Sequence, residues 1–401
     1  MLLFEQFPEY KAAITCPDGA IYNFKGLSQT QRELLWSRTY FNMKWLENVG
    51  MDAPTTLDEL YEVLVAFKEQ DANGNGDPND EIPIGGIYVN NGSDYRKSIS
   101  YMVLNALGFY DQLIDVDDNG TVRFVPTEDN YIEYLRFVNK LVEEELIDSE
   151  YFTQDNNTRN SKTAAGLYGV LVTTGANWSE MSDPELYNQY KMIAPLTSEF
   201  CSDGKASAKD VVLTGGFAIT SACKDPVPLI KLLDVIMTEQ GSIDEQQGAE
   251  KGVYRDDAGY VLRTDENGML GMDLIYPESE YSSYNNYRSA EVTRQELPYF
   301  WPWDIPLHIR FNPQQVDLTN QITEAYVPHY RNGFPTKMTT PEEAQELSAL
   351  RAELESYLWQ TEVAIMCGDV ELEAGFEDMV KGLKERGSER YAEIYQGIYD
   401  R

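Results

Sequence analysis

The sequence contains few basic residues, few histidines and no long apolar run. Acidic residues number 67 against 32 basic ones in 401, which gives a formal net charge of −35 at pH 7. Such an excess repels nucleic-acid phosphates and anionic lipid surfaces, so it argues against both as main partners. The two histidines, His308 and His329, are too few for a histidine-rich metal centre. No segment approaches the ~20 apolar residues that a membrane helix needs.

Cysteine is also scarce, and the four cysteines form no CxxC pair. Their even number permits two disulfides, but a chain of this length does not need them for stability. Because free cysteine prefers the interior of proteins, we expect four buried free thiols. They are Cys16, Cys201, Cys223 and Cys367.

The first residues, MLLFEQFPEYKAAITCPDGAIY, lack the features of a secretory signal. They contain no basic segment, no sustained apolar segment and no small-residue cleavage site. We therefore expect either a cytosolic protein or a sequence that begins within a longer chain.

Strand and helix signals alternate through the middle of the chain, and helices gather at its end. The clearest helix is 57–70, where Thr56 and Glu59 form a capping box before apolar residues at i, i+3, i+4 and i+7 spacing. Hairpins are predicted at 13–24 and 113–125, and 253–310 is turn-rich with few regular elements. Further helices are predicted at 29–48, 97–107, 127–146, 226–239, 340–367, 373–386 and 388–400, and strands at 167–173, 190–194 and 211–220. This alternation favours an α/β fold in which helices cover sheets.

The sharpest local motif is the polar segment that follows the predicted helix 57–70. Oxygen-bearing side chains recur at every second residue around Gly76, which permits a tight bend. Calcium takes six to eight oxygens at ~2.4 Å, and such a loop can wrap them around one ion. The twelfth residue is Ile82 rather than glutamate and Pro83 replaces an exit helix, so the loop is EF-hand-like without being an EF-hand. The alternative is an acidic surface loop with Asx turns. The oxygen-bearing residues are Asp71, Asn73, Asn75, Asp77, Asn79, Asp80 and Glu81.

Aromatic residues make up 12% of the chain, enough to suggest rings that contact a ligand. Flat apolar rings with polar neighbours suit sugars, whose C–H faces are apolar and whose hydroxyls need partners. Trp178 follows a predicted strand, and Tyr299, Trp301 and Trp303 lie in an irregular stretch. The alternative for all four is ordinary packing under loops. Three further tryptophans lie in predicted helices and are expected in the core: Trp36, Trp45 and Trp359.

No arrangement of nucleophile and base indicates an enzyme. The sequence has neither GxSxG, nor a Walker loop, nor GxGxxG after a strand. With 67 acidic residues, a glycosidase carboxylate pair cannot be identified from the sequence.

The order of several motifs resembles the family 1 extracellular solute-binding lipoproteins of ABC importers. The specific motifs are PTTLDEL at 54–60 and the acidic loop at 71–83. The supporting motifs are Trp45-Leu46-Glu47 with Gly50, PDGAIY at 17–22, the strand and aromatic unit at 167–178, GGFAI at 215–219, MTEQGS at 237–242 and MCGD at 366–369. The branch it is similar to carries a calcium loop and is associated with oligosaccharide uptake in Gram-positive bacteria.

The resemblance implies an α/β, two-lobe fold of the periplasmic-binding-protein type (class II), with hinge strands and a helical C-terminal region. It places 1–25 and 212–300 in the first lobe, and 26–211 and 301–401 in the second. It implies a monomeric binding protein, not an enzyme, that holds a carbohydrate in an interlobe cleft and docks on a membrane permease.

The resemblance also implies particular site residues. Trp178 is the expected sugar-stacking residue, with Tyr299, Trp301 and Trp303 as further candidates. A structural Ca²⁺ is expected on Asp71, Asn73, Asn75, the Asp77 carbonyl, Asp80 and Glu81, although the loop is one residue longer than the family pattern.

Family members begin with a lipoprotein signal, a lipid-attachment cysteine and the opening βαβ of the first lobe, which this sequence lacks. We therefore expect an N-terminally truncated member of an extracellular, lipid-anchored parent, with an open sheet edge and uncovered apolar surface in the first lobe. Two alternatives stay open: a secreted glycoside hydrolase with a carboxylate pair, and a cytosolic acidic scaffold.

Overall fold

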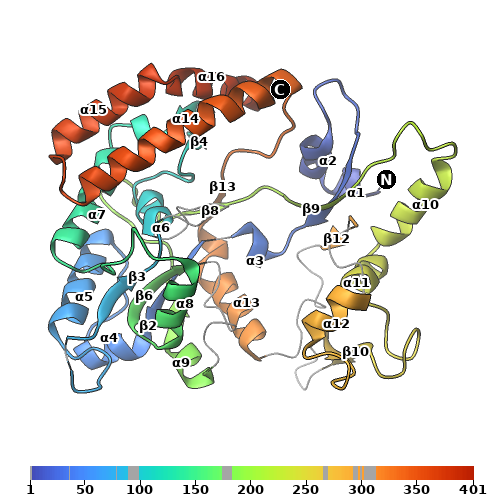
Figure 1. Cartoon of the computed structure of the whole chain (residues 1–401), viewed down its shortest axis with the longest axis horizontal. Coiled ribbons are helices and arrows are strands. Elements are labelled where there is room, and N and C mark those ends of the chain that lie inside the picture. The colour runs from blue at the N-terminus through green and yellow to red at the C-terminus, as the bar shows by residue number, and fades with distance from the viewer. Residues whose placement is uncertain are drawn as a thin grey trace. The chain divides into compact units, whose positions relative to one another are not determined.

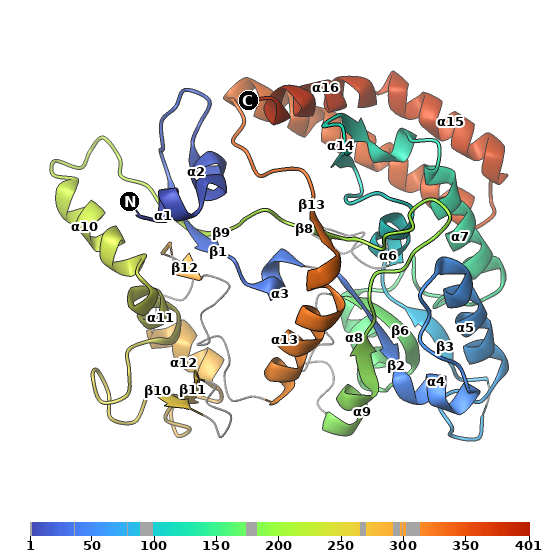
Figure 2. The ribbon, with the colours of Figure 1, turned by 180° about the vertical axis from the view of Figure 1, so that it is seen from behind.

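The chain divides into two compact units, each assembled from three segments. Unit 1 comprises Met1–Leu34, Lys209–Asn320 and Pro335–Thr340, and unit 2 comprises Leu35–Ala208, Gln321–Phe334 and Pro341–Arg401. The structure is a computed structural model, shown from two sides in Figures 1 and 2. It describes residues 2–35, 37–77, 79–88, 99–173, 183–264, 270–291, 297–298, 300–301 and 313–401. None of the helices in these ranges is long and apolar enough to span a membrane.

Unit 2 is built on a four-stranded sheet with the order β3-β6-β2-β7. Its strands are β2 (Arg38–Asn42), β3 (Ile82–Gly85), β6 (Tyr168–Thr173) and β7 (Tyr190–Met192). β2 runs antiparallel to β6 and β7, whereas β3 runs parallel to β6. All five residues of β2 are buried, as expected of a central strand that is covered on both faces.

Helix α5 (Leu57–Glu69) is defined by a capped first turn and an apolar face that packs on its neighbour. Thr56 Oγ1 accepts a hydrogen bond from the Glu59 amide at 3.1 Å, which caps the first turn. The Glu59 carboxylate reaches back to the Thr55 amide at 2.7 Å, one residue earlier than a capping box requires. The inward face of α5 meets α4 (Met43–Val49), where the Trp45 and Phe67 rings pack edge to face at 5.4 Å.

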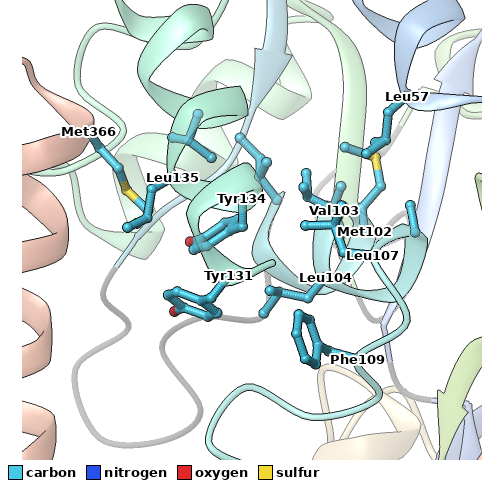
Figure 3. Close-up of a cluster of buried hydrophobic side chains, with 14 of the residues drawn as sticks. Leu57, Met102, Val103, Leu104, Leu107, Phe109, Tyr131, Tyr134, Leu135 and Met366 are labelled. Carbon is cyan, nitrogen blue, oxygen red and sulfur yellow. The ribbon is translucent and has the colours of Figure 1, made fainter. Parts of the chain in front are cut away.

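The large core of unit 2 joins these elements to the C-terminal helices α14 (Pro341–Met366), α15 (Leu372–Glu385) and α16 (Ser388–Tyr399). Figure 3 shows part of this core, including Leu104, Phe109 and Tyr131. The carboxylate of Glu362, on α14, is fully buried there and accepts hydrogen bonds from the hydroxyls of Tyr88 and Tyr131. These bonds satisfy a carboxylate that would otherwise be costly in an apolar core.

The remaining elements of unit 2 are short. Its other helices are α6 (Ile99–Ala106), α7 (Tyr131–Glu143), α8 (Asn156–Ala164) and α9 (Pro184–Gln189), with 3₁₀ turns at Val125–Thr127 and Val327–His329. Strands β4 (Ile114–Val116) and β5 (Val122–Phe124) form a hairpin, and β8 (Ala206–Ala208) pairs with β13 (Tyr330–Asn332). Helix α13 (Pro313–Ala325) contains the boundary between the units.

Unit 1 contains a three-stranded sheet with the order β12-β1-β9. Here β1 (Phe24–Ser28) runs antiparallel to β9 (Val212–Phe217) and parallel to β12 (Phe300–Trp301). A hairpin of β10 (Gly259–Thr264) and β11 (Leu270–Ile275) lies elsewhere in the unit. The helices are α1 (Leu2–Gln6), α2 (Pro8–Ile14), α3 (Gln31–Leu34), α10 (Val227–Ile236), α11 (Glu239–Gln247) and α12 (Tyr284–Glu291).

The apolar clusters of unit 1 are much smaller than the core of unit 2. Helix α10 leaves several large apolar side chains in solvent, among them Val227 at 55% exposure, Leu232 at 47% and Val235 at 62%. Exposed apolar residues gathered on one helix are unusual for a solvent-facing surface.

Three sequence predictions of local structure are wrong. The predicted hairpin at 13–24 is instead the end of α2 and a turn, in which the Gly19 amide bonds to the Cys16 carbonyl at 2.8 Å. The predicted helix at 29–48 contains β2, because burial of this strand on both faces removes the alternation by which a strand is usually identified. The region 253–310, predicted to hold few regular elements, contains the paired strands β10 and β11 and the helix α12.

The cysteine and tryptophan predictions are only partly confirmed. All four cysteines are free thiols, but only Cys201 is buried, and Cys367 is exposed. Trp45 is a core residue, whereas Trp359 is half-buried on α14. Trp36 lies outside the described residues.

Candidate functional site

The polar loop predicted to bind calcium connects α5 to β3. Its backbone curls through successive Asx turns: Asn73 Oδ1 accepts from the Asn75 amide at 2.8 Å, and Asn75 Oδ1 accepts from the Asp77 amide at 2.7 Å. Gly74 and Gly76 have φ angles of +75° and +94°, a region that L-residues with side chains rarely adopt. The alternation of asparagine and glycine therefore builds the curl.

Acidic residues close this loop from both ends. Asp71 Oδ2, at the start, accepts from the Gly76 amide at 2.9 Å. Asp80, near the end, accepts from the side-chain amides of Asn73 and Asn75 at 2.7 Å each. Glu81 Oε1 accepts from the Asn73 amide at 3.3 Å.

Two carboxylate oxygens in the loop have no hydrogen-bond partner among the described residues. Asp71 Oδ1 and Glu81 Oε2 are both buried and unpaired. A buried unpaired acceptor costs about 1–3 kcal/mol, and more when it is charged, so native structures rarely leave one without a reason. Burial raises the pKa of Glu81, and the negative charges of Asp80 and Asp71 raise it further. The site therefore gathers negative charge that its own side chains do not neutralise.

The predicted calcium ligands thus come together, although not as a finished metal cluster. In the described part of the chain, no three acidic, histidine or cysteine side chains are placed to hold a metal ion as they stand. Asn73 and Asn75 direct their NH₂ groups toward Asp80, and each Oδ1 accepts one backbone amide, which leaves the second lone pair of that oxygen for a cation. The donor set is entirely oxygen, which is the ligand type that Ca²⁺ prefers.

Sequence reasoning missed one residue that holds this loop in place. Asn48, near the end of α4, donates from Nδ2 to the Ala72 carbonyl at 2.8 Å. The same nitrogen lies 3.0 Å from where a Cβ on Gly74 would be, so the loop packs closely against α4. Nothing in the sequence near Asn48 signals this contact, because it links residues that are distant along the chain.

The structure does not test the aromatic candidates. Trp178, Tyr299 and Trp303 lie outside the described residues. Trp301 contributes its backbone to β12, where it pairs with Ser28, but its side chain is not described.

The fold is that of the two-lobe solute-binding proteins. The *S. pneumoniae* substrate-binding protein FusA in complex with kestose matches with a TM-score of 0.71 at 24% identity, over 100% of this chain and 80% of that one. An extracellular solute-binding protein from *Bifidobacterium longum* subsp. *infantis* matches with a TM-score of 0.81 at 22% identity, over the same shares. An EF-hand mutant of FusA in complex with fructo-nystose also matches, with a TM-score of 0.71.

Sequence comparison leads to the same class of protein. The fructooligosaccharide ABC transporter substrate-binding protein FusA of *Streptococcus pneumoniae* serotype 4 is 28% identical over 418 residues, covering 99% of this chain and 72% of FusA. Lipoprotein LipO of *Bacillus subtilis* is 33% identical over 285 residues, covering 66% of this chain and 54% of LipO. No family model matches the chain. In sequence the chain is thus similar to substrate-binding proteins of ABC transporters, the class that its motifs resemble.

Proposed function

We propose that the chain binds a carbohydrate, most simply an oligosaccharide, and delivers it to the membrane permease of an ABC importer. Support comes from FusA, a relative along nearly the whole chain that is described as a fructooligosaccharide-binding protein. The relatives are binding proteins, so we propose binding without catalysis. We also propose that the protein works outside the cell, attached to the membrane as a lipoprotein; LipO is a lipoprotein.

The proposed mechanism is closure of the two lobes over the ligand. Hinge closure around a bound ligand is a common transition of two-lobe binding proteins, and the closed form would dock on the permease. Trp178 is the proposed stacking residue, with Tyr299, Trp301 and Trp303 as further candidates. A ring that stacks on a sugar contributes apolar contact, while neighbouring polar groups bind the hydroxyls.

We further propose that the loop between α5 and β3 binds a structural Ca²⁺. The proposed ligands are Asp71, Asn73, Asn75, the Asp77 carbonyl, Asp80 and Glu81. The observation that supports this best is the pair of buried, unpaired oxygens on Asp71 and Glu81. A cation would pair with both and would lower the raised pKa of Glu81.

Two measurements test these proposals on the whole chain. Differential scanning calorimetry with calcium or with a chelator tests the ion: calcium must raise the melting temperature, and identical melting in both would contradict the calcium proposal. Incubation with oligosaccharides, followed by product analysis, tests binding against catalysis. Saturable heat with intact sugar supports the binding protein, whereas turnover would favour a glycoside hydrolase.

A further inference from the structure

Unit 2 contains a cavity of about 220 Å³ beside the middle of α14. All of the residues that line it belong to unit 2, so it is complete within that unit. They come from α6, the segment leading into β4, the end of the β13 segment, α14 and α16. The lining residues are Tyr101, Asp111, Gln112, Leu113, Ile114, Phe334, Arg351, Glu355, Tyr391 and Tyr395.

One wall of the cavity is aromatic and ordered by ring packing. Tyr391 and Tyr395 lie one turn apart on α16, with ring centroids 5.0 Å apart. Phe334 packs edge to face against Tyr395 at 5.1 Å. Tyr391 is itself anchored in the core by an edge contact with Phe124 at 5.9 Å. The rings are therefore fixed before any ligand arrives, which lowers the entropic cost of binding.

The wall formed by α14 carries opposite charges. Arg351 and Glu355 lie one helical turn apart, and Arg351 Nε donates to Glu355 Oε1 at 2.8 Å. The Glu355 side chain is only 11% exposed, whereas that of Arg351 is 50% exposed. Gln112 closes another side of the cavity, where its Nε2 donates to Ser100 Oγ at 2.7 Å. Carboxylate, guanidinium and amide groups thus surround a space that an apolar ligand would not fill favourably.

We propose that this cavity is a subsite for one sugar ring. At about 220 Å³ it is smaller than the roughly 300–1,000 Å³ pockets that hold drug-sized ligands, which suits a single ring rather than a whole oligosaccharide. Tyrosine and phenylalanine rings offer faces for the sugar C–H groups, and Glu355 and Arg351 offer an acceptor and donors for its hydroxyls. That the ligand is a sugar rests on the proposed function, whereas the location of the site is inferred from the cavity and its lining residues.

The mixed charge of the cavity favours a neutral ligand. Glu355 and Arg351 already pair with each other. A charged ligand that bound to one of them would therefore have to compete with the other. Asp111 Oδ1 is occupied by the backbone amides of Gln112 and Leu113, at 2.6 and 3.1 Å. A neutral polyhydroxylated ring can bond to such groups without separating the ion pair.

Four single variants of the whole chain test the subsite. Glu355→Gln and Tyr395→Leu alter the cavity while keeping side-chain size or apolar character. The matched controls are Glu346→Gln, on the exposed side of α14, and Tyr357→Leu, whose side chain contacts α15 and Arg386; neither residue lines the cavity. The probes are kestose, maltotriose, fructose, glucose and galactose at millimolar concentrations, measured by calorimetry and saturation-transfer NMR. Hydrogen exchange of the amides at 109–114 reports on the site directly.

The proposal expects at least one sugar to bind, with exchange at 109–114 slowed in its presence. Each cavity variant should weaken that binding by about tenfold or more, because each removes a charged or aromatic contact, and each control should leave it unchanged. If a sugar binds but the cavity variants bind it normally, or the controls weaken it equally, the subsite is wrong and the proposed function stands. If none of the sugars binds, the proposed function fails and the subsite with it.

Discussion

Replacing Glu81 with glutamine should change stability in opposite directions with and without calcium. Without the ion, Glu81 places a charge beside Asp71 and Asp80, and one of its oxygens is buried without a partner. Glu81→Gln removes that charge, so the chelated variant should be as stable as the unaltered protein or more so. With calcium, the same change removes a ligand and should be destabilising.

The expected magnitude follows from mass action. An ion present at 100 times its dissociation constant stabilises the folded state by about 2.7 kcal/mol. For domains of 150–250 residues, 1 kcal/mol moves the melting temperature by about 2–4 °C. Calcium should therefore raise the melting temperature of unit 2 by roughly 5–10 °C, and Glu81→Gln should lose most of this rise.

The pH dependence gives an independent test of the same site. Because the pKa of Glu81 is raised in the folded state, the folded protein holds this proton more tightly than the unfolded chain does. Without calcium, the contribution of this residue to stability therefore falls as pH rises from its usual pKa through the raised one. With chelator, the unfolding free energy of the unaltered protein should therefore fall relative to that of Glu81→Gln as pH rises through this range. With calcium bound, this pH-dependent difference should disappear.

Calorimetry of six samples decides the matter: the unaltered protein, Glu81→Gln and a control variant, each with calcium and with chelator. The matched control is Glu62→Gln, an exposed residue of α5, which should respond to calcium as the unaltered protein does. A calcium-induced rise of equal size in Glu81→Gln, or no rise in any sample, would refute the reasoning.

Three further predictions concern other parts of the chain. Trp178→Ala should weaken oligosaccharide binding by at least tenfold in titration calorimetry, and unchanged affinity would exclude it as the stacking residue. Burial opposes ionisation of Asp148, yet hydrogen bonds from Lys162 and from other groups hold its pKa below the usual value. Asp148→Asn should therefore cost about 3–5 kcal/mol in urea unfolding near pH 7 and less as pH falls through that lowered pKa; an equal cost at all pH values would contradict this. Val235→Asn, with Val227→Asn, should reduce binding of a hydrophobic dye without lowering the melting temperature, since both side chains lie mainly in solvent.

The sequence predicted those helices and hairpins that are determined by residues close together in the chain. Helix α5 begins where Thr56 predicts it, because a cap and an amphipathic face act within a few residues. The β4–β5 hairpin forms around Asp118-Asn119-Gly120 for the same reason, with Gly120 at a φ of +82°. Strand β2 could not be identified in this way, because its character depends on distant segments that bury both of its faces.

The candidate metal site was predictable in composition but not in detail. The alternating oxygens around Gly76 are visible in the sequence, and the structure brings them into one curled loop. The burial of Asp71 Oδ1 and Glu81 Oε2 and the contact of the loop with Asn48 of α4 arise only in the folded chain, so the sequence alone could not reveal them. The cavity beside α14 and α16 likewise combines residues from distant parts of the chain.

The most direct test of the account is titration calorimetry of the whole chain, in calcium, against a panel of oligosaccharides that includes kestose, with the recovered sugar analysed afterwards. The account predicts saturable binding of at least one oligosaccharide at one equivalent, with the sugar recovered intact. No saturable heat with any member of the panel, or release of shorter sugars, would contradict it.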